Sequence, residues 1–367
     1  MAPKKKANGE GSLSIEKSTG LYRAAITDPN GKRIVKRFKE RKAAVEWLTN
    51  IKSEVYKNTY VPPSNITLGK WMLDYFDTYV IPKVRPKTLQ RYLQSSKFLE
   101  PMSDIPLQKI TAHSVQKFYN NLPEMSFSSK LKIHKLLKAM ITKAYALEMI
   151  PKNVMANVEA PQNIEVQEIS IFTQEEIKKL LETTKASRYY AKYYPIIALG
   201  VATGARLGEI LGLKYNCIKD DSIIINNSLQ ELNGKLFDMP PKTKAGYRNI
   251  TISPHLVAML KNSYLKHKVI SLNGYVFHTS TGTALAPRNF EKVWKKLLQE
   301  AGIPHKRFHS LRHTHATQLL AAGVPLLEVS KRLGHARSSH TLDLYGHAIP
   351  GYDSNIPDKI DALFFAK

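Results

Sequence analysis

The sequence predicts a multidomain, mainly α-helical chain with small β-sheets, that is, an α+β architecture. Its length of 367 residues is enough for two or three domains. Short segments that alternate between apolar and polar residues lie near the N-terminus, and long helical patterns fill the middle of the chain. The 43% hydrophobic and 23% charged content is ordinary for a folded protein, so a wholly disordered chain is excluded.

A small N-terminal domain is predicted over residues 1–62. The segment Asp28-Pro29-Asn30-Gly31 favours a tight turn because proline fixes φ and Asn-Gly tolerates positive φ. The strand after this turn carries Arg33, Lys36 and Arg37. Such a basic sheet face can lie in the major groove of DNA, although a solvated edge strand protected by lysines has the same pattern. The expected elements are strands at 13–16, 21–27 and 33–38 and a helix at about 40–56.

A helical domain is predicted over residues 63–163, with Thr67 as the N-cap of its first helix. Four of its basic residues are candidate DNA contacts: Lys87, Arg91, Lys135 and Lys138. Lysines on a helix must face solvent in any fold, so this evidence is weak by itself. The expected helices span 68–79, 86–99, 112–122 and 126–148.

A mixed domain is predicted over residues 164–367. Thr173 and Glu176 form a capping-box pattern at the start of a helix. A second helix is expected at about 190–203 and a third after Gly204, and the chain is helical again after Pro287. Three alternating segments, 222–226, 235–239 and 247–252, are expected to form one small antiparallel sheet.

The formal charge is +25, and every part of the chain contributes to it. Residues 1–66 carry +8, residues 67–161 carry +7 and residues 162–367 carry +10. This distribution indicates a long polyanionic partner, with solubility as the alternative explanation. The longest apolar run, near residues 194–205, is shorter than the roughly 18 residues of a membrane span, and the N-terminal lysines do not form a signal peptide. With Cys217 as the single cysteine, no internal disulfide is possible, and we expect a soluble, cytoplasmic protein.

Two motifs in the mixed domain carry arginines among apolar residues. Arg206 follows Thr-Gly-Ala and precedes Glu209 by one helical turn, so the carboxylate can hold the guanidinium while other donors reach a phosphate. A purely structural ion pair between these two residues is the alternative. Further on, His309 and Arg312 are three residues apart and share one face of a helix.

Histidines in this region also raise the question of a metal site. His309 and His313 lie four residues apart, but the zinc-protease glutamate is absent and no third ligand is evident. No metal and no cofactor are therefore expected. Two further motifs follow, Leu333-Gly334-His335 and Tyr345-Gly346-His347.

Together, these motifs resemble the signature of the tyrosine recombinase family, specifically the phage and mobile-element integrases. The resemblance covers nearly the whole chain. It implies an arm-site DNA-binding domain, a helical SAM-like core-binding domain and a mixed α+β catalytic domain, in that order. It also implies a catalytic lysine on a β-hairpin, which we assign to Lys242, with Lys244 as the competitor.

The resemblance implies a role for each of the site residues. Tyr345 attacks the scissile phosphate and forms a 3′-phosphotyrosine, and Lys242 protonates the departing 5′-oxygen. The remaining residues are expected to bind the phosphate (Arg206, Arg312, His335), to take the proton of the tyrosine (His309) and to support the site (Glu209). Alternatives are a type IB-like topoisomerase and a non-catalytic DNA-binding regulator.

The resemblance also implies the partners. These are double-stranded DNA with core and arm attachment sites, a homotetramer that works through a Holliday junction, and accessory bending and directionality proteins in a bacterial host. The C-terminal segment 356–367 is apolar, and we expect it to dock on a neighbouring protomer or, alternatively, on its own domain.

Overall fold

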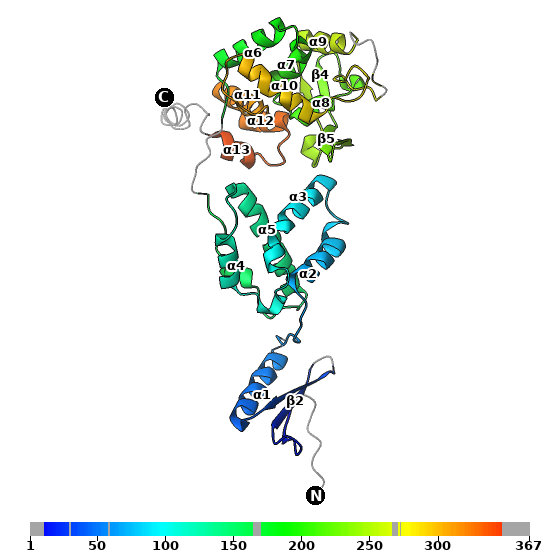
Figure 1. The fold of residues 1–367 in the computed structure, drawn as a ribbon. Coiled ribbons are helices and arrows are strands. Elements are labelled where there is room, and N and C mark those ends of the chain that lie inside the picture. Colours follow the sequence, from blue (N-terminus) through cyan, green and yellow to red (C-terminus); the bar gives the residue numbers. More distant parts are fainter. Residues whose placement is uncertain are drawn as a thin grey trace, which may run out of the picture. The chain divides into compact units, whose positions relative to one another are not determined.

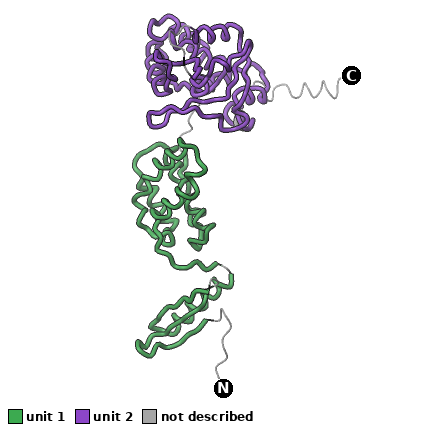
Figure 2. The backbone as a smooth tube through the Cα atoms, turned by 90° about the vertical axis from the view of Figure 1, so that its right-hand side faces the viewer, with its two compact units in different colours: residues 1–166 green, residues 167–367 purple. Residues whose placement is uncertain are grey.

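The computed structural model describes residues 11–28, 31–57, 59–163, 170–265, 271 and 273–346. It divides the chain into two compact units, residues 1–166 and 167–367 (Figure 2). The predicted N-terminal and helical domains belong to the first unit, and the second unit consists of the predicted mixed domain without its first three residues. The expected docking of segment 356–367 lies outside the described residues.

The N-terminal part of the first unit is a three-stranded antiparallel sheet with one helix, as predicted (Figure 1). The central strand β2 pairs along its whole length, from Tyr22 opposite Phe38 to Thr27 opposite Arg33. Its small and apolar residues 24–26 are buried and pack with α1. The elements are β1 (Ser12–Ile15), β2 (Tyr22–Thr27), β3 (Arg33–Phe38) and α1 (Arg41–Tyr56).

The predicted turn after β2 leads into the next strand of this sheet, β3. The carboxylate of Asp28 accepts a hydrogen bond from the backbone N–H of Lys32 at 2.7 Å. Gly31 has a φ of +80°, a conformation that glycine adopts without a steric penalty. The contacts of Asp28 and Gly31 therefore lie where the sequence predicts a turn, between β2 and β3.

Four α-helices form the middle of the chain, with shorter helical turns between them and after the last. Thr67 caps the first helix, because its hydroxyl accepts a hydrogen bond from the N–H of Lys70 at 3.3 Å. Trp71 is 1% exposed in the core, and its indole N–H donates to the carbonyl of Met140 at 3.0 Å. The α-helices are α2 (Leu68–Tyr75), α3 (Pro86–Ser96), α4 (Ala112–Asn120) and α5 (Phe127–Ala146), and the shorter turns span Phe76–Val80, Lys97–Met102, Leu107–Lys109 and Val154–Asn157.

The first of these helices differs from the prediction of one continuous α-helix over 68–79. The α-helix ends at Tyr75, and Phe76–Val80 continues as a π-helical turn. The buried face moves from Leu68 and Trp71 to Phe76 and Val80, a step of five residues that a regular 3.6-residue period does not produce. The wider turn thus brings both aromatic and aliphatic side chains into one core.

The second unit packs helices around a large apolar core. The capping box predicted at its first helix is present, since Thr173 and Glu176 exchange side-chain and backbone hydrogen bonds. Its helices are α6 (Gln174–Ala186), α7 (Tyr194–Thr203), α8 (Leu207–Leu211), α9 (Pro254–Leu265), α10 (Pro287–Glu300), α11 (Ser310–Ala321), α12 (Leu326–Leu333) and α13 (Ser339–Tyr345), with 3₁₀ turns at Ala191–Tyr193, Tyr215–Cys217 and Lys244–Gly246 (Figure 1).

The strands of this unit differ from the expected single sheet. The described residues of this unit contain four strands, β4 (Ser222–Ile225), β5 (Ser228–Leu232), β6 (Lys235–Met239) and β7 (Arg248–Thr251). They form two separate antiparallel pairs, β4 with β7 and β5 with β6. Strand β5 was not predicted, although the Asn233-Gly234 turn after it, with φ of +50° and +77°, has the sequence of a two-residue hairpin loop.

Candidate active site

The first arginine of the site stands where α7 ends and α8 begins. Gly204 ends α7 with a φ of +61°, and a Cβ there would lie 2.8 Å from the ring of His315 and 2.9 Å from Leu333. Only glycine fits this close approach, and it turns the chain so that Arg206 precedes α8. The guanidinium of Arg206 donates to Glu209 at 2.8 Å, and its backbone N–H donates to the same carboxylate at 2.9 Å.

Exposure differs sharply within this ion pair. The side chain of Arg206 is 43% exposed, whereas that of Glu209 is 6% exposed. The guanidinium is thus bound by a buried carboxylate while much of the arginine side chain stays exposed, an arrangement that leaves N–H donors available to an anion.

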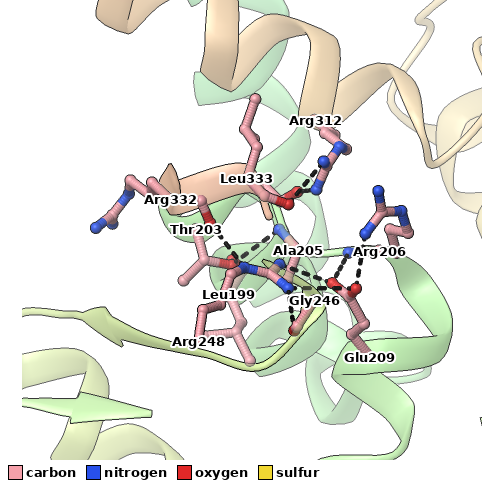
Figure 3. Close-up of polar contacts among 11 residues, drawn as sticks. Leu199, Thr203, Ala205, Arg206, Glu209, Gly246, Arg248, Arg312, Arg332 and Leu333 are labelled. Atoms are coloured by element: carbon pink, nitrogen blue, oxygen red, sulfur yellow. Dashed lines mark hydrogen bonds and ion pairs between the residues drawn. The ribbon is translucent and has the colours of Figure 1, made fainter. Parts of the chain in front are cut away.

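A second arginine, which the sequence analysis missed, binds the same carboxylate. Arg248 donates to Glu209 at 2.8 and 3.3 Å (Figure 3). Burial alone would raise the pKa of Glu209, but Arg248 and Arg206 hold it below its ordinary value, so the carboxylate is ionised. The available signal was the position of Arg248 two residues before buried Ile250, on the same face of β7.

Arg312, the third arginine, is 2% exposed and lies on α11. It donates to the carbonyl of Gly204 at 3.0 Å and to that of Leu333 at 2.7 Å. These bonds connect the C-terminal ends of α7 and α12 through one guanidinium. Figure 3 shows the bond to Leu333. Burial and the nearby positive charge of Arg206 lower the pKa of Arg312 to about 9, so it is still protonated at neutral pH.

Tyr345, at the end of α13, is 1% exposed, and its hydroxyl lies 2.6 Å from Nδ1 of His313. Burial raises the pKa of Tyr345, while Arg312 and Arg206 act in the opposite direction. Burial and Arg312 lower the pKa of His313, so this ring is neutral at pH 7. A neutral histidine can accept a proton from the phenol.

The two histidines that the resemblance assigns to the site are His309 and His335. His309 immediately precedes α11, and its ring packs edge-on against that of His313 with centroids 4.8 Å apart. Partial desolvation, His313 and Arg312 lower the pKa of His309 to about 4. His335 follows α12, and Nδ1 of its ring lies 2.7 Å from the hydroxyl oxygen of Thr341.

The lysine candidates, Lys242 and Lys244, are both exposed and lie in the segment between β6 and β7. We call residues 240–247 the lysine loop. Because β6 pairs with β5 and β7 pairs with β4, this loop connects two sheets and does not close the β-hairpin that was expected. Within the described part of the chain, neither lysine takes part in an ion pair.

Known proteins match this chain in sequence over most of its length. Residues 170–350 match the phage integrase family, and residues 67–122 match its N-terminal SAM-like domain. A tyrosine recombinase XerC-like protein from Caldanaerobacter subterraneus subsp. tengcongensis is 31% identical, over 95% of this chain and 98% of its own length. The chain belongs to the phage integrase family of tyrosine recombinases.

Solved structures share the fold of this integrase. A Tn1549 transposon integrase in complex with circular intermediate DNA matches with a TM-score of 0.71 at 19% identity, over 81% of this chain and 99% of that one. A lambda integrase tetramer bound to a Holliday junction matches with a TM-score of 0.57 at 20% identity, over 92% and 96% of the two chains. The predicted α+β multidomain fold is thereby confirmed.

Among the described residues, no group of three or more His, Cys, Asp or Glu side chains is arranged to hold a metal ion. Within the same residues, no helix is both long and apolar enough to cross a membrane.

The basic residues predicted to bind DNA are all exposed: Arg33, Lys36, Arg37, Lys87, Arg91, Lys135 and Lys138. Three of them have local partners. Arg37 donates to Glu16 at 2.7 Å, Lys36 lies over the ring of Phe38 at 5.5 Å, and Arg91 lies over the ring of Tyr92 at 5.3 Å. The others project from α3 and α5 and from the start of β3, where a phosphate backbone can reach them.

His315 predicts how the stability of the integrase depends on pH. Its Nε2 must accept from Arg332 at 3.2 Å and its Nδ1 donates to the carbonyl of Val201 at 2.9 Å, so the folded site requires the neutral ring. Burial lowers its pKa to about 4, against 6.5 for an unperturbed histidine. Between these two pH values the unfolded chain binds a proton that the folded chain does not. The stabilisation that the neutral ring of His315 gives the folded chain is therefore complete above pH 6.5 and is lost as the pH falls toward 4.

We therefore expect His315→Gln to flatten the pH dependence of unfolding free energy in this window, by up to about 1.4 kcal/mol per pH unit. Urea unfolding at several values between pH 4.5 and 7 measures it. The control is the exposed His255→Gln on α9, which is expected to keep the wild-type slope. An unchanged slope in His315→Gln would contradict the assignment.

Proposed function

We propose that this site-specific recombinase cuts and rejoins DNA through a 3′-phosphotyrosine on Tyr345, and that it inserts or excises a mobile element at attachment sites. The observation that carries the proposal is the meeting of Tyr345 and a neutral histidine beside two arginines, Arg206 and Arg312, whose charges act on the pKa of the phenol. A nucleophile, a proton acceptor and phosphate-binding groups are the parts that such a transesterification needs.

In the proposed cleavage step, the hydroxyl oxygen of Tyr345 forms a bond to phosphorus and the bond from phosphorus to the 5′-oxygen breaks. Arg206 and Arg312 bind the non-bridging oxygens, whose negative charge grows in the transition state. His335 donates a further hydrogen bond to the phosphate, and Glu209 holds Arg206 in place. The covalent link retains the energy of the phosphodiester, so rejoining requires no nucleotide.

The 5′-oxygen leaves as an alcohol when the lysine loop supplies a proton. We assign this general acid to Lys242, with Lys244 as the competitor. Both are exposed on one short loop, which is consistent with a side chain that reaches toward bound DNA. In the second step the reaction reverses with the 5′-hydroxyl of another strand as nucleophile, and the lysine takes the proton back.

The proton of Tyr345 goes to a histidine in this mechanism. The resemblance assigns the role to His309, whereas the 2.6 Å contact to the phenol oxygen favours His313. The two rings touch each other, so both are near the nucleophile.

The proposed partners are double-stranded DNA with core and arm sites, and three further copies of the chain. Support for a tetramer comes from the lambda integrase tetramer bound to a Holliday junction, whose fold this chain shares. In this arrangement residues 1–62 bind arm sites, and residues 63–163 and 164–367 bind the core duplex. Accessory bending and directionality proteins are further proposed partners. The proposed location is the cytoplasm of a bacterial host.

Tyr345→Phe is expected to abolish covalent adducts with a nicked suicide duplex that carries the core site, because phenylalanine has no nucleophilic oxygen. Denaturing gel electrophoresis measures the adduct. Tyr189→Phe, at a 76% exposed tyrosine of the same unit, is the control and is expected to form it normally. An adduct in Tyr345→Phe would refute the assignment, and relaxation of plasmids without any core site would favour a topoisomerase.

The pH profile of single-turnover cleavage separates the two histidines. The one that takes the proton must be neutral, so wild-type cleavage is expected to level off above its pKa. We expect His313→Gln to lower the rate about 10²-fold at pH 7 and to make it rise steadily with pH toward the range where the phenol ionises. If His309→Gln shows this profile and His313→Gln does not, the proton goes to His309.

Salt dependence tests the proposed DNA contacts of α5. Each lost phosphate contact should reduce the slope of log K against log salt by about 0.9. We expect Lys135→Ala with Lys138→Ala to reduce the slope for core-site binding by about two such steps. The control is Lys261→Ala, whose amine lies 3.2 Å from Asp220. An unchanged slope in the α5 variant would place its lysines outside the interface.

A further inference from the structure

We propose that Arg248 is a positioning residue that fixes the lysine loop against Glu209 and the end of α12, and so places the general-acid lysine at the scissile phosphate. The inference rests on the proposed role of the loop lysine in protonating the leaving 5′-oxygen. Arg248 itself is not expected to touch DNA, because its side chain is only 6% exposed.

The contacts of Arg248 join three segments that are distant in the sequence (Figure 3). Its Nε donates to the carbonyl of Arg332 at 2.7 Å, next to the end of α12. Its Nη2 donates to Glu209 at 2.8 Å, and its Nη1 donates to the same carboxylate at 3.3 Å and to the carbonyl of Gly246 at 3.2 Å. One rigid guanidinium thus reaches α8, α12 and the lysine loop at once, which a lysine ammonium cannot do with the same geometry.

The lysine loop is folded closely onto itself and onto this arginine. Gly246 is buried, and a Cβ on it would lie 2.6 Å from Pro241 at the other side of the loop. The backbone N–H of Gly246 also donates to the carbonyl of Thr243 at 2.9 Å. Lys242 and Lys244 therefore project from a compact turn whose base is bonded to Arg248.

The loop also lies against the residue that precedes His335. Gly334 has a φ of +71°, and a Cβ there would lie 2.8 Å from the carbonyl oxygen of Ala245 and 3.0 Å from Arg248. The two backbones meet here with no space for a side chain. A shift of Arg248 would therefore move the lysine loop relative to His335 and to the phosphate-binding arginines of the site.

A structural ion pair is the other explanation, because Arg248 neutralises a buried carboxylate. Arg332 provides a matched control for this role. It is also a partly buried arginine that donates to backbone carbonyls, at Ala202 and Thr251, and to His315. Its side chain bonds neither Glu209 nor the lysine loop.

The experiment compares cleavage of two suicide duplexes, one ordinary and one with sulfur in place of the bridging 5′-oxygen. A thiol ionises near pH 8.5 and leaves as a thiolate without being protonated, so loss of the general acid no longer matters. We expect Arg248→Lys to slow single-turnover cleavage of ordinary DNA about 10-fold or more, and to differ less than about 3-fold from wild type on the sulfur duplex. Arg332→Lys is expected to change both rates by the same factor.

Lysine variants distinguish failure of this inference from failure of the proposed function. If Lys242→Ala or Lys244→Ala is rescued by sulfur but Arg248→Lys is not, the inference is wrong and the lysine role stands. If no lysine variant is rescued, the general-acid role is wrong and the inference falls with it. Arg248→Gln repeats the comparison without a charge at this position, and thermal melting checks that this variant folds. The inference is supported only if the sulfur duplex rescues both an Arg248 variant and a variant of a loop lysine.

Discussion

The structure of the site depends on one buried carboxylate, Glu209, that is shared by two arginines. The shortest contact of the Arg206 guanidinium is with Oε1 and that of Arg248 is with Oε2, each at 2.8 Å. Taking an ionised carboxylate out of water is costly, and the two guanidinium groups offset that cost only while both are present. Removing either partner would leave an uncompensated charge, so the start of α8, strand β7 and the end of α12 are held in one arrangement by this group.

Much of the fold follows from patterns that the sequence displays openly. The alternating strands, the Asp28 turn and the caps at Thr67 and Thr173 all depend on local chemistry, and all are present in the structure. The π-helical turn after Tyr75 and the division of the strands into two pairs were not predicted, because long-range packing decides them. The spacing of apolar residues predicts which face of a helix is buried, but it does not predict where packing against the core widens one turn of the helix by a residue.

The candidate site likewise combines residues that local motifs predict with contacts between residues that are distant in the sequence. The motifs predicted Arg206, Glu209 and Arg312, and the structure brings them together. The motifs did not predict Arg248, because its partners lie 39 and 84 residues away in the chain. The contact of Tyr345 with His313, 32 residues earlier, was missed for the same reason: the resemblance named His309, one helical turn away on the same face.

The charge balance of the site explains why it suits a phosphodiester. Three guanidinium groups surround one carboxylate, and the repulsion is visible in the pKa of Arg312, which Arg206 lowers further than burial does alone. A bound phosphate would bring one negative charge to this excess, and the five-coordinate transition state would bring more. Binding therefore relieves repulsion that the folded chain already contains, and the relief grows as the reaction proceeds. In the proposed mechanism, the repulsion between Arg206 and Arg312 would therefore favour the transition state over the ground state.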